Sequence, residues 1–111
     1  MNENHVKNHI KSLRNKKLAT LDWKSPFTID SMKTDLVIIT TSTGKPRNVP
    51  LQGTIDAYNH IMKHGNITRT EIEEQEYTIR NTAYMAAILA SLPEIEHTIR
   101  PITLYKKETN T

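Results

Sequence analysis

Residues 67–105 decide the fold of this chain, and their sequence is ITRTEIEEQEYTIRNTAYMAAILASLPEIEHTIRPITLY. Thr68 and Glu71 in it have the spacing of a capping box. In that motif the threonine hydroxyl accepts from the backbone amide three residues on, and the glutamate accepts from the threonine amide. The spacing therefore predicts a short helix over residues 68–75.

A second, longer helix is predicted over residues 79–92. Apolar residues recur there at i, i+3, i+4 and i+7, the period of one buried helical stripe. The stripe consists of Met85, Ile88, Leu89 and Leu92. Thr78 or Asn81 can cap the start of the helix, and Pro93 ends it because proline disfavours a helical residue before it.

The opposite face of this second helix carries small side chains in place of the usual lysines and glutamates. It consists of Arg80, Ala83, Ala87 and Ala90, with Tyr84 and Ser91 on its flank. Small side chains permit the close approach of a large partner, which could be the floor of a DNA major groove. The alternative is packing against another protein helix, the commoner fate of an apolar helix face.

Residues 95–105 favour two short strands, because Ile99, Ile102 and Leu104 are strand-forming. Arg100-Pro101 interrupts the run and predicts a turn between them. Upstream, Pro50 suits the first position of a helix over residues 50–64, and Gly65 provides a left-handed stop after it.

Three helices at 50–64, 68–75 and 79–92, followed by a strand pair, make an order that resembles the winged helix-turn-helix family. The resemblance covers about residues 50–105 and implies DNA binding, with the helix at 79–92 in the major groove. It implies base contacts from Arg80, Asn81 and Tyr84, phosphate contacts from Arg69 and Thr70, and a wing that contains Arg100.

The residues before this stretch predict an N-terminal helix and a β-hairpin, which the family fold does not require. Val6, Ile10 and Leu13 form a narrow apolar stripe in a helix over residues 3–18. In a connector over residues 19–26, Trp23 is expected to anchor the segment to the core. The overall class is therefore α+β, a single domain with a basic segment 1–24, a hairpin 27–49 and a core 50–105.

The hairpin is expected to pair residues 27–29 with 36–39, and a polar loop with two cations follows it. This loop contains Gly44-Lys45-Pro46-Arg47, which is similar to the basic, proline-containing arms that enter DNA minor grooves. Ordinary turn cations are the alternative interpretation of Lys45 and Arg47.

Charge is distributed unevenly along the 111 residues, whose formal net charge is +3. Residues 1–24 hold six cations against two carboxylates, whereas residues 65–111 hold five cations against seven carboxylates. If the chain binds nucleic acid, we therefore expect the N-terminal segment to supply much of the electrostatic attraction to phosphate.

No catalytic, metal or cofactor site is predicted. The chain has no cysteine, no glycine-rich phosphate loop and no serine in a nucleophile turn. His5 and His9, like His60 and His64, have an i, i+4 spacing that can bind a metal, but no third ligand is evident. The acidic cluster Glu71, Glu73, Glu74 and Glu76 is expected to be a solvated face.

These features predict a cytoplasmic protein that is not an enzyme and has no membrane contact. The leading hypothesis is sequence-specific binding of double-stranded DNA, as a small regulator or as the recognition module of a larger nuclease. The alternative is a protein-interaction module, such as a small phage-type inhibitor or an assembly adaptor, that uses the alanine face. A homodimer or another protein partner stays open.

Overall fold

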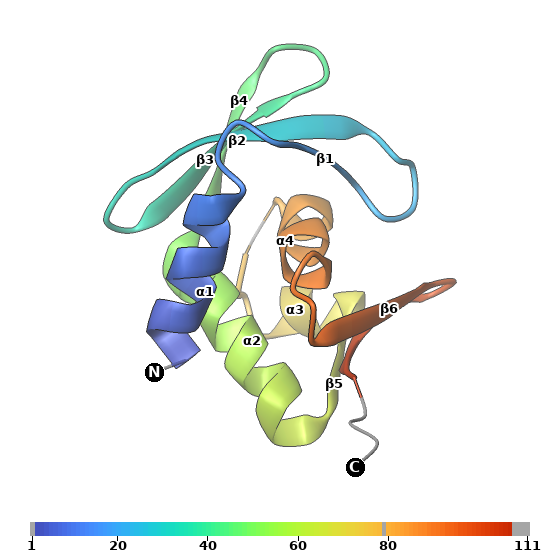
Figure 1. The fold of residues 1–111 in the computed structure, drawn as a ribbon. Helices are drawn as coiled ribbons and strands as arrows, with labels where there is room; N and C mark the ends of the chain where they lie inside the picture. Colours follow the sequence, from blue (N-terminus) through green and yellow to red (C-terminus); the bar gives the residue numbers. More distant parts are fainter. Residues whose placement is uncertain (1, 79, 108–111) are drawn as a thin grey trace.

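The computed structural model describes residues 2–78 and 80–107, which form a mixed α+β fold (Figure 1). The N-terminal half contains α1 (Asn2–Ser12), β1 (Lys17–Ala19), β2 (Pro26–Met32), β3 (Leu36–Thr41) and β4 (Pro46–Pro50). The C-terminal half contains α2 (Leu51–His64), β5 (Asn66–Thr68), α3 (Arg69–Glu74), α4 (Thr82–Ala90), β6 (Ile95–Ile99) and β7 (Ile102–Lys106).

The strands form two antiparallel sheets. One has the strand order β1-β2-β3-β4, and the other has the order β5-β7-β6. In Figure 1 the four-stranded sheet lies across the top, with α1 and α4 beneath it and the three-stranded sheet at the lower right. Helices α2 and α4 contact strands of both sheets.

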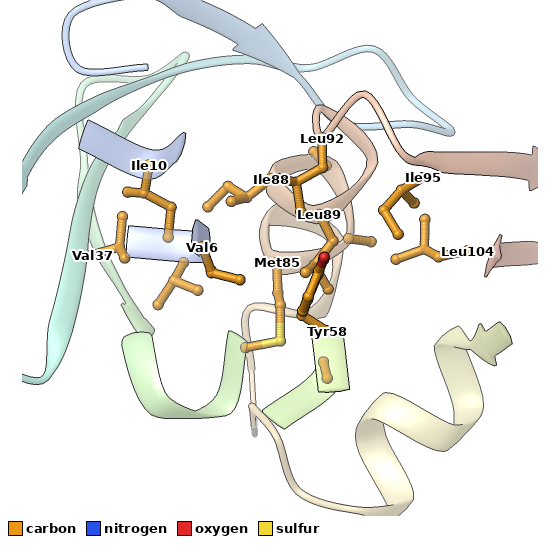
Figure 2. Close-up of a cluster of buried hydrophobic side chains, with 14 of the residues drawn as sticks. Val6, Ile10, Val37, Tyr58, Met85, Ile88, Leu89, Leu92, Ile95 and Leu104 are labelled. Atoms are coloured by element: carbon orange, nitrogen blue, oxygen red, sulfur yellow. The ribbon is translucent and has the colours of Figure 1, made fainter. Parts of the chain in front are cut away.

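Helix α4 is the centre of the hydrophobic core. Figure 2 shows its side chains between those of α1 and β3 on one side and those of β6 and β7 on the other. The predicted stripe of Met85, Ile88, Leu89 and Leu92 is buried as expected. Ile55 and Tyr58 of α2 and Ile72 of α3 are buried with it, so all three C-terminal helices contribute to one core.

Local signals from the sequence hold well in the C-terminal half. Thr68 and Glu71 form both hydrogen bonds of the capping box, at 3.0 and 2.9 Å. Gly65 adopts the left-handed conformation that ends α2, with φ of 92°. Helix α4 begins at Thr82 and ends at Ala90, a shorter span than the predicted 79–92, and residue 79 lies outside the described residues.

Gly53 in the first turn of α2 has a low helix propensity, but the close approach of another segment requires a glycine at this position. A side chain at this position would overlap the backbone carbonyl of Tyr77, which lies against the first turn of α2. The glycine therefore permits the backbone of Tyr77 to lie directly on the helix.

The N-terminal helix is shorter than the predicted 3–18. It ends at Ser12, and Lys17–Ala19 form strand β1, which pairs with β2. The change of direction occurs at Asn15, whose φ of 66° is left-handed, and its amide donates to the carbonyl of Ile29. The apolar stripe itself is correct, since Val6, Ile10 and Leu13 are buried.

The prediction that Trp23 anchors the connector was wrong. It lies in the turn between β1 and β2, and 84% of its surface is exposed. Leu21 is buried in the core in its place, and the turn is closed by a bond from the amide of Ser25 to the hydroxyl of Thr20.

The predicted hairpin over residues 27–49 is part of a larger sheet. Strands β2 and β3 pair as expected, but β1 adds to one edge and β4 to the other. The polar loop after residue 41 was expected to be irregular, yet Pro46–Pro50 pair along β3. Strand β4 is an edge strand, where proline is tolerated because its missing N–H costs no ladder bond.

Candidate nucleic-acid interface

The start of α4 is joined to the hairpin of β3 and β4. The side-chain amide of Asn81 donates to the backbone carbonyl of Asn48 over 2.7 Å. Arg47 pairs across the strands with Ile39, whose side chain is buried beneath the sheet. Because cross-strand partners share one face of a sheet, Arg47 lies on the side of the sheet that faces the helices.

This junction joins two segments that carry four of the residues predicted to contact DNA. They are Arg80 and Asn81 at the start of α4, Arg47 one residue from Asn48, and Lys45 in the turn at the end of the hairpin. All three cations are exposed, and within residues 2–78 and 80–107 none of them has an ion-pair partner. The cluster therefore presents unneutralised positive charge at one end of α4.

The rest of the helix face expected to read bases is covered by the chain itself. Tyr84 packs edge to face on Phe27 of β2. Ala87 is 5% exposed, and Ala83 and Ala90 are half-buried. The alanine face thus meets protein, which was the alternative that the sequence left open. The accessible part of α4 is its N-terminal end.

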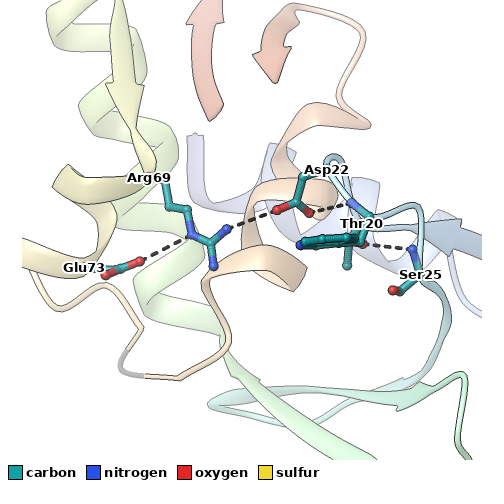
Figure 3. Close-up of polar contacts among 6 residues, drawn as sticks. Thr20, Asp22, Ser25, Arg69 and Glu73 are labelled. Atoms are coloured by element: carbon teal, nitrogen blue, oxygen red, sulfur yellow. Dashed lines mark hydrogen bonds and ion pairs between the residues drawn. The ribbon is translucent and has the colours of Figure 1, made fainter. Parts of the chain in front are cut away.

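Arg69 is held by carboxylates at the start of α3 (Figure 3). Its Nη1 lies 3.3 Å from Asp22 Oδ2, and its Nε lies 3.4 Å from Glu73 Oε1. A guanidinium with two carboxylate partners has little charge left for a phosphate. Neighbouring Thr70 is exposed but lies beside this neutralised group.

Arg100 lies in the turn of the β6–β7 hairpin, away from the other predicted site residues. Figure 1 shows this hairpin projecting from the body of the molecule on the side opposite α1. Most of β6 is exposed, including Ile99 beside the turn. The structure thus divides the predicted residues into four places: the Asn81 junction, the covered position of Tyr84 against β2, the start of α3 and this hairpin.

Charge separates between the two halves of the fold. Residues 1–50, which form α1 and the four-stranded sheet, contain nine cations and four carboxylates. Residues 51–107 contain six cations and seven carboxylates. From sequence, the basic N-terminus was expected to attract phosphate, but none of its residues was assigned to a binding site. Lys7, Lys11 and Arg14 follow a helical spacing there.

The two N-terminal histidines serve as structural contacts. His5 Nε2 lies 2.5 Å from Glu94 Oε2, which also accepts from the Tyr58 hydroxyl over 2.8 Å. His9 Nε2 lies 2.8 Å from Ser91 Oγ, and the serine donates its proton to the Ile88 carbonyl. His9 must therefore donate to Ser91, which is the reverse of a base that activates a nucleophile.

These contacts shift the pKa values of their groups. Burial lowers the pKa of His9 because it disfavours the charged imidazolium. Burial alone would raise the pKa of Glu94, but hydrogen bonds from Tyr58, its own amide and His5 outweigh it and lower that pKa. Burial and the same hydrogen bond raise the pKa of Tyr58.

His60 and His64 border an open pocket of about 420 Å³ on α2, together with Tyr77 and Asp56. His60 Nε2 lies 3.6 Å from Glu71 Oε2, while Glu71 is already engaged in the capping box. Across the described part of the chain, no group of three or more such side chains is placed to hold a metal ion.

Comparison of the chain with protein-family models, with curated proteins and with solved structures finds no match. In residues 2–78 and 80–107, no helix has the length and apolar character needed to cross a bilayer. The function of the chain is therefore inferred from its own geometry.

Proposed function

We propose that the protein binds double-stranded DNA as a variant of the winged helix-turn-helix, in the cytoplasm, as a small regulator or as part of a nuclease. The order α2-β5-α3-α4-β6-β7, with β7 central in its sheet, supports the fold assignment. In this assignment α3 and α4 are the helix-turn-helix and the β6–β7 hairpin is the wing.

One observation carries the proposal: the cluster at the start of α4. Arg80 is exposed just before the first turn, and the Asn81–Asn48 hydrogen bond holds β4 next to it, with Arg47 one residue from Asn48 and Lys45 further along in the hairpin turn. Unpaired guanidinium groups can contact phosphate or donate two hydrogen bonds to guanine. Since the alanine face is covered, base contacts come from this end of the helix and not from its length.

The basic N-terminal half would supply the remaining attraction. Its excess of cations lies on α1 and on the hairpins of the four-stranded sheet, to which the Arg80 cluster is joined. Each phosphate neutralised by such a cation releases counterions, so binding should weaken steeply with salt.

A protein-interaction module is the second candidate function. Its support comes from exposed apolar side chains in or beside two turns, and no longer from the alanine face. The alanine face is covered, but Trp23 is 84% exposed on the β1–β2 turn, and Ile99 is 39% exposed near the tip of the β6–β7 hairpin. Exposed tryptophan is typical of residues that contribute strongly to protein interfaces.

A fluorescence-anisotropy titration with labelled duplexes of selected and scrambled sequence tests the proposal. We expect salt-sensitive binding to both, and Arg80→Ala should cost about 1–3 kcal/mol on the selected duplex and much less on the scrambled one. Lys63→Ala, which removes an exposed cation of α2 outside the cluster, is the control and should change neither. Absence of binding at low salt would reject the proposal in favour of the interaction module.

A further inference from the structure

A surface pocket of about 320 Å³ lies where the end of α1 meets β2. Its floor is apolar, and its rim carries two cations and one hydroxyl. The lining residues are Ile10, Lys11, Arg14, Ile29, Ser31 and Met32. Its volume falls within the lower part of the range of small-molecule sites.

A β-bulge shapes this pocket. The register between β2 and β3 shifts between Ile29 and Ser31, so Asp30 is the extra residue. Bulges re-aim side chains and carbonyl groups relative to a regular strand. Here the carbonyl of Asp30 accepts from Arg14 Nε over 3.0 Å.

This bond orients the guanidinium. Arg14 has its Nε occupied by the Asp30 carbonyl, and among the described residues no partner is found for its two terminal nitrogens. A guanidinium fixed at one nitrogen presents the other two as a fork, the geometry that matches two oxygens of a phosphate or carboxylate.

The positive charge of the pocket is not neutralised from within the described chain. Neither Lys11 nor Arg14 has a carboxylate within ion-pair distance there. The acidic residue of the bulge, Asp30, directs its carboxylate to the hydroxyls of Thr28 and Thr40. The pocket therefore combines two unpaired cations with a serine hydroxyl.

We infer that this pocket binds the phosphate group of a nucleotide unit. The guanidinium of Arg14 and the ammonium of Lys11 take the phosphate oxygens, Ser31 donates a further hydrogen bond, and the apolar floor contacts the sugar. Phosphate suits this donor set better than a lone carboxylate because it offers more acceptor oxygens to three separate donors.

The phosphate can come from a polynucleotide backbone or from a free nucleotide. In the first form the inference rests on the proposed DNA binding, and the pocket would be a defined backbone contact at the end of α1. In the second form it does not depend on DNA binding, and the pocket is a site for a small ligand.

The test compares Lys11→Gln with Lys16→Gln, an exposed neighbour that does not line the pocket. Both variants lose one positive charge, so a general charge effect changes them equally. Arg14→Lys, which keeps the charge and loses the fork, is the third variant. This variant also loses the Nε–H that donates to the Asp30 carbonyl, so its urea unfolding is compared with that of the parent before its binding is interpreted.

Two probes distinguish the sources of the phosphate. Binding of deoxyadenosine monophosphate is measured by calorimetry and by changes in the NMR chemical shifts of backbone amides. Binding of a short random duplex is measured by fluorescence anisotropy. If the backbone is the source, we expect Lys11→Gln to weaken duplex binding by up to roughly fivefold beyond Lys16→Gln, which is the upper end of what one exposed ion pair contributes. Arg14→Lys should also weaken binding. If a free nucleotide is the source, the monophosphate shifts the amides of residues 10–14 and 29–32, and Lys11→Gln abolishes these shifts.

Two outcomes would overturn the inference. The pocket would be rejected as a phosphate site, with DNA binding left intact, if Lys11→Gln and Lys16→Gln weaken duplex binding equally and the monophosphate shifts no amide signal. Absence of binding for both probes would remove the pocket and the proposed function together. Monophosphate binding without duplex binding would keep the pocket and reject the proposed function.

Discussion

The rings of Phe27 and Tyr84 meet edge to face, with their centroids 5.1 Å apart. This contact joins β2 to α4 on the side of the helix that the sequence was expected to present to DNA. The helix is consequently an internal element of the fold, covered on the outside by the four-stranded sheet. Any DNA contact must be made around this cover, from the N-terminal end of α4 and from the basic hairpin beside it.

Ala87→Lys tests whether α4 is covered. If its face were free to meet DNA, a lysine there would raise DNA affinity at little cost. Because Ala87 is 5% exposed, we expect the added chain and charge to lower the free energy of unfolding by about 2 kcal/mol or more. Gln52→Lys on the exposed face of α2 keeps Asp56 as a partner, and it should stay within about 0.5 kcal/mol of the parent. Urea unfolding followed by circular dichroism measures both.

Leu89→Ala should lower the free energy of unfolding by about 2–5 kcal/mol, because Leu89 is fully buried at the centre of the core and its truncation leaves a cavity. Ile99→Ala, at a partly exposed strand position, is the comparison and should cost much less. Chemical denaturation of both variants gives the two values. Similar losses of stability would mean that the core is not centred on α4.

Two glycines should respond differently to alanine. Gly53→Ala places a methyl group against the carbonyl of Tyr77, so it should cost more than the ~1 kcal/mol typical of a strained glycine position. Gly65→Ala meets no neighbouring atom and carries only the strain of its left-handed φ, at about 1 kcal/mol. Thermal unfolding of the two variants gives the comparison, and the reverse order would contradict the packing of Tyr77 on α2.

Stability should fall in acid in two stages. The pKa of His9 is lowered from its usual 6.5, so the unfolded chain takes up this proton first as the pH falls below 6.5. The pKa of Glu94 and of Glu71 is lowered from 4.5, so their contribution is present above pH 4.5 and is lost as the pH falls through the folded values. Urea unfolding across a series of acidic to neutral buffers should show both stages.

Variants separate the two stages of acid destabilisation. His9→Gln should remove the stage below pH 6.5, because glutamine keeps a donor for Ser91 without a titrating ring. Glu94→Gln should reduce the stage below pH 4.5. His97→Gln removes an exposed imidazole from β6 and is the control. If the pH dependence of the free energy of unfolding changes as much in His97→Gln as in His9→Gln, the contact of His9 with Ser91 is not the cause of the first stage.

Arg69→Ala should leave DNA affinity almost unchanged on any duplex. From sequence, this residue was expected to contact phosphate and its removal to weaken all sequences alike. The ion pairs with Asp22 and Glu73 alter that expectation, because they already neutralise the guanidinium. The anisotropy titration described for Arg80 measures it, and a uniform weakening would show that Arg69 leaves its carboxylates to bind phosphate.

Deleting residues 1–18 would test the basic N-terminus directly, but this segment is part of the hydrophobic core. Val6, Ile10 and Leu13 are buried in it, so the deletion should unfold the protein. Single lysine substitutions are the usable alternative. Each lysine that binds a phosphate should, when it is replaced by glutamine, reduce the slope of log affinity against log salt by about 0.9.

Sequence reasoning succeeded where the signal is local. The capping box, Gly65 and the stripe around Leu89 each depend on residues close together in the chain, and the structure contains them all. It failed at β4, which pairs with β3 only a few residues before it: its two prolines are typical of a loop, yet the edge of a sheet accepts them. Tertiary packing also decided the alanine face, because the sequence does not say which segment covers a helix.

The pocket at the bulge could not be found from sequence for a related reason. Lys11 and Arg14 have a visible helical spacing, but Ser31 joins them only because β2 shifts its register at Asp30. A bulge has no reliable signature in a single sequence, so the third donor stays hidden until the strands are paired.

The exposed position of Trp23 has a spectroscopic consequence. It is the only tryptophan of the chain, and its indole is already in water before unfolding. Its fluorescence will therefore change little when the core melts, and a flat emission trace would not mean a stable protein. The same isolation makes the indole a built-in optical probe for contact: a blue shift or quenching on mixing with any ligand would report occupation of the β1–β2 turn, without a label.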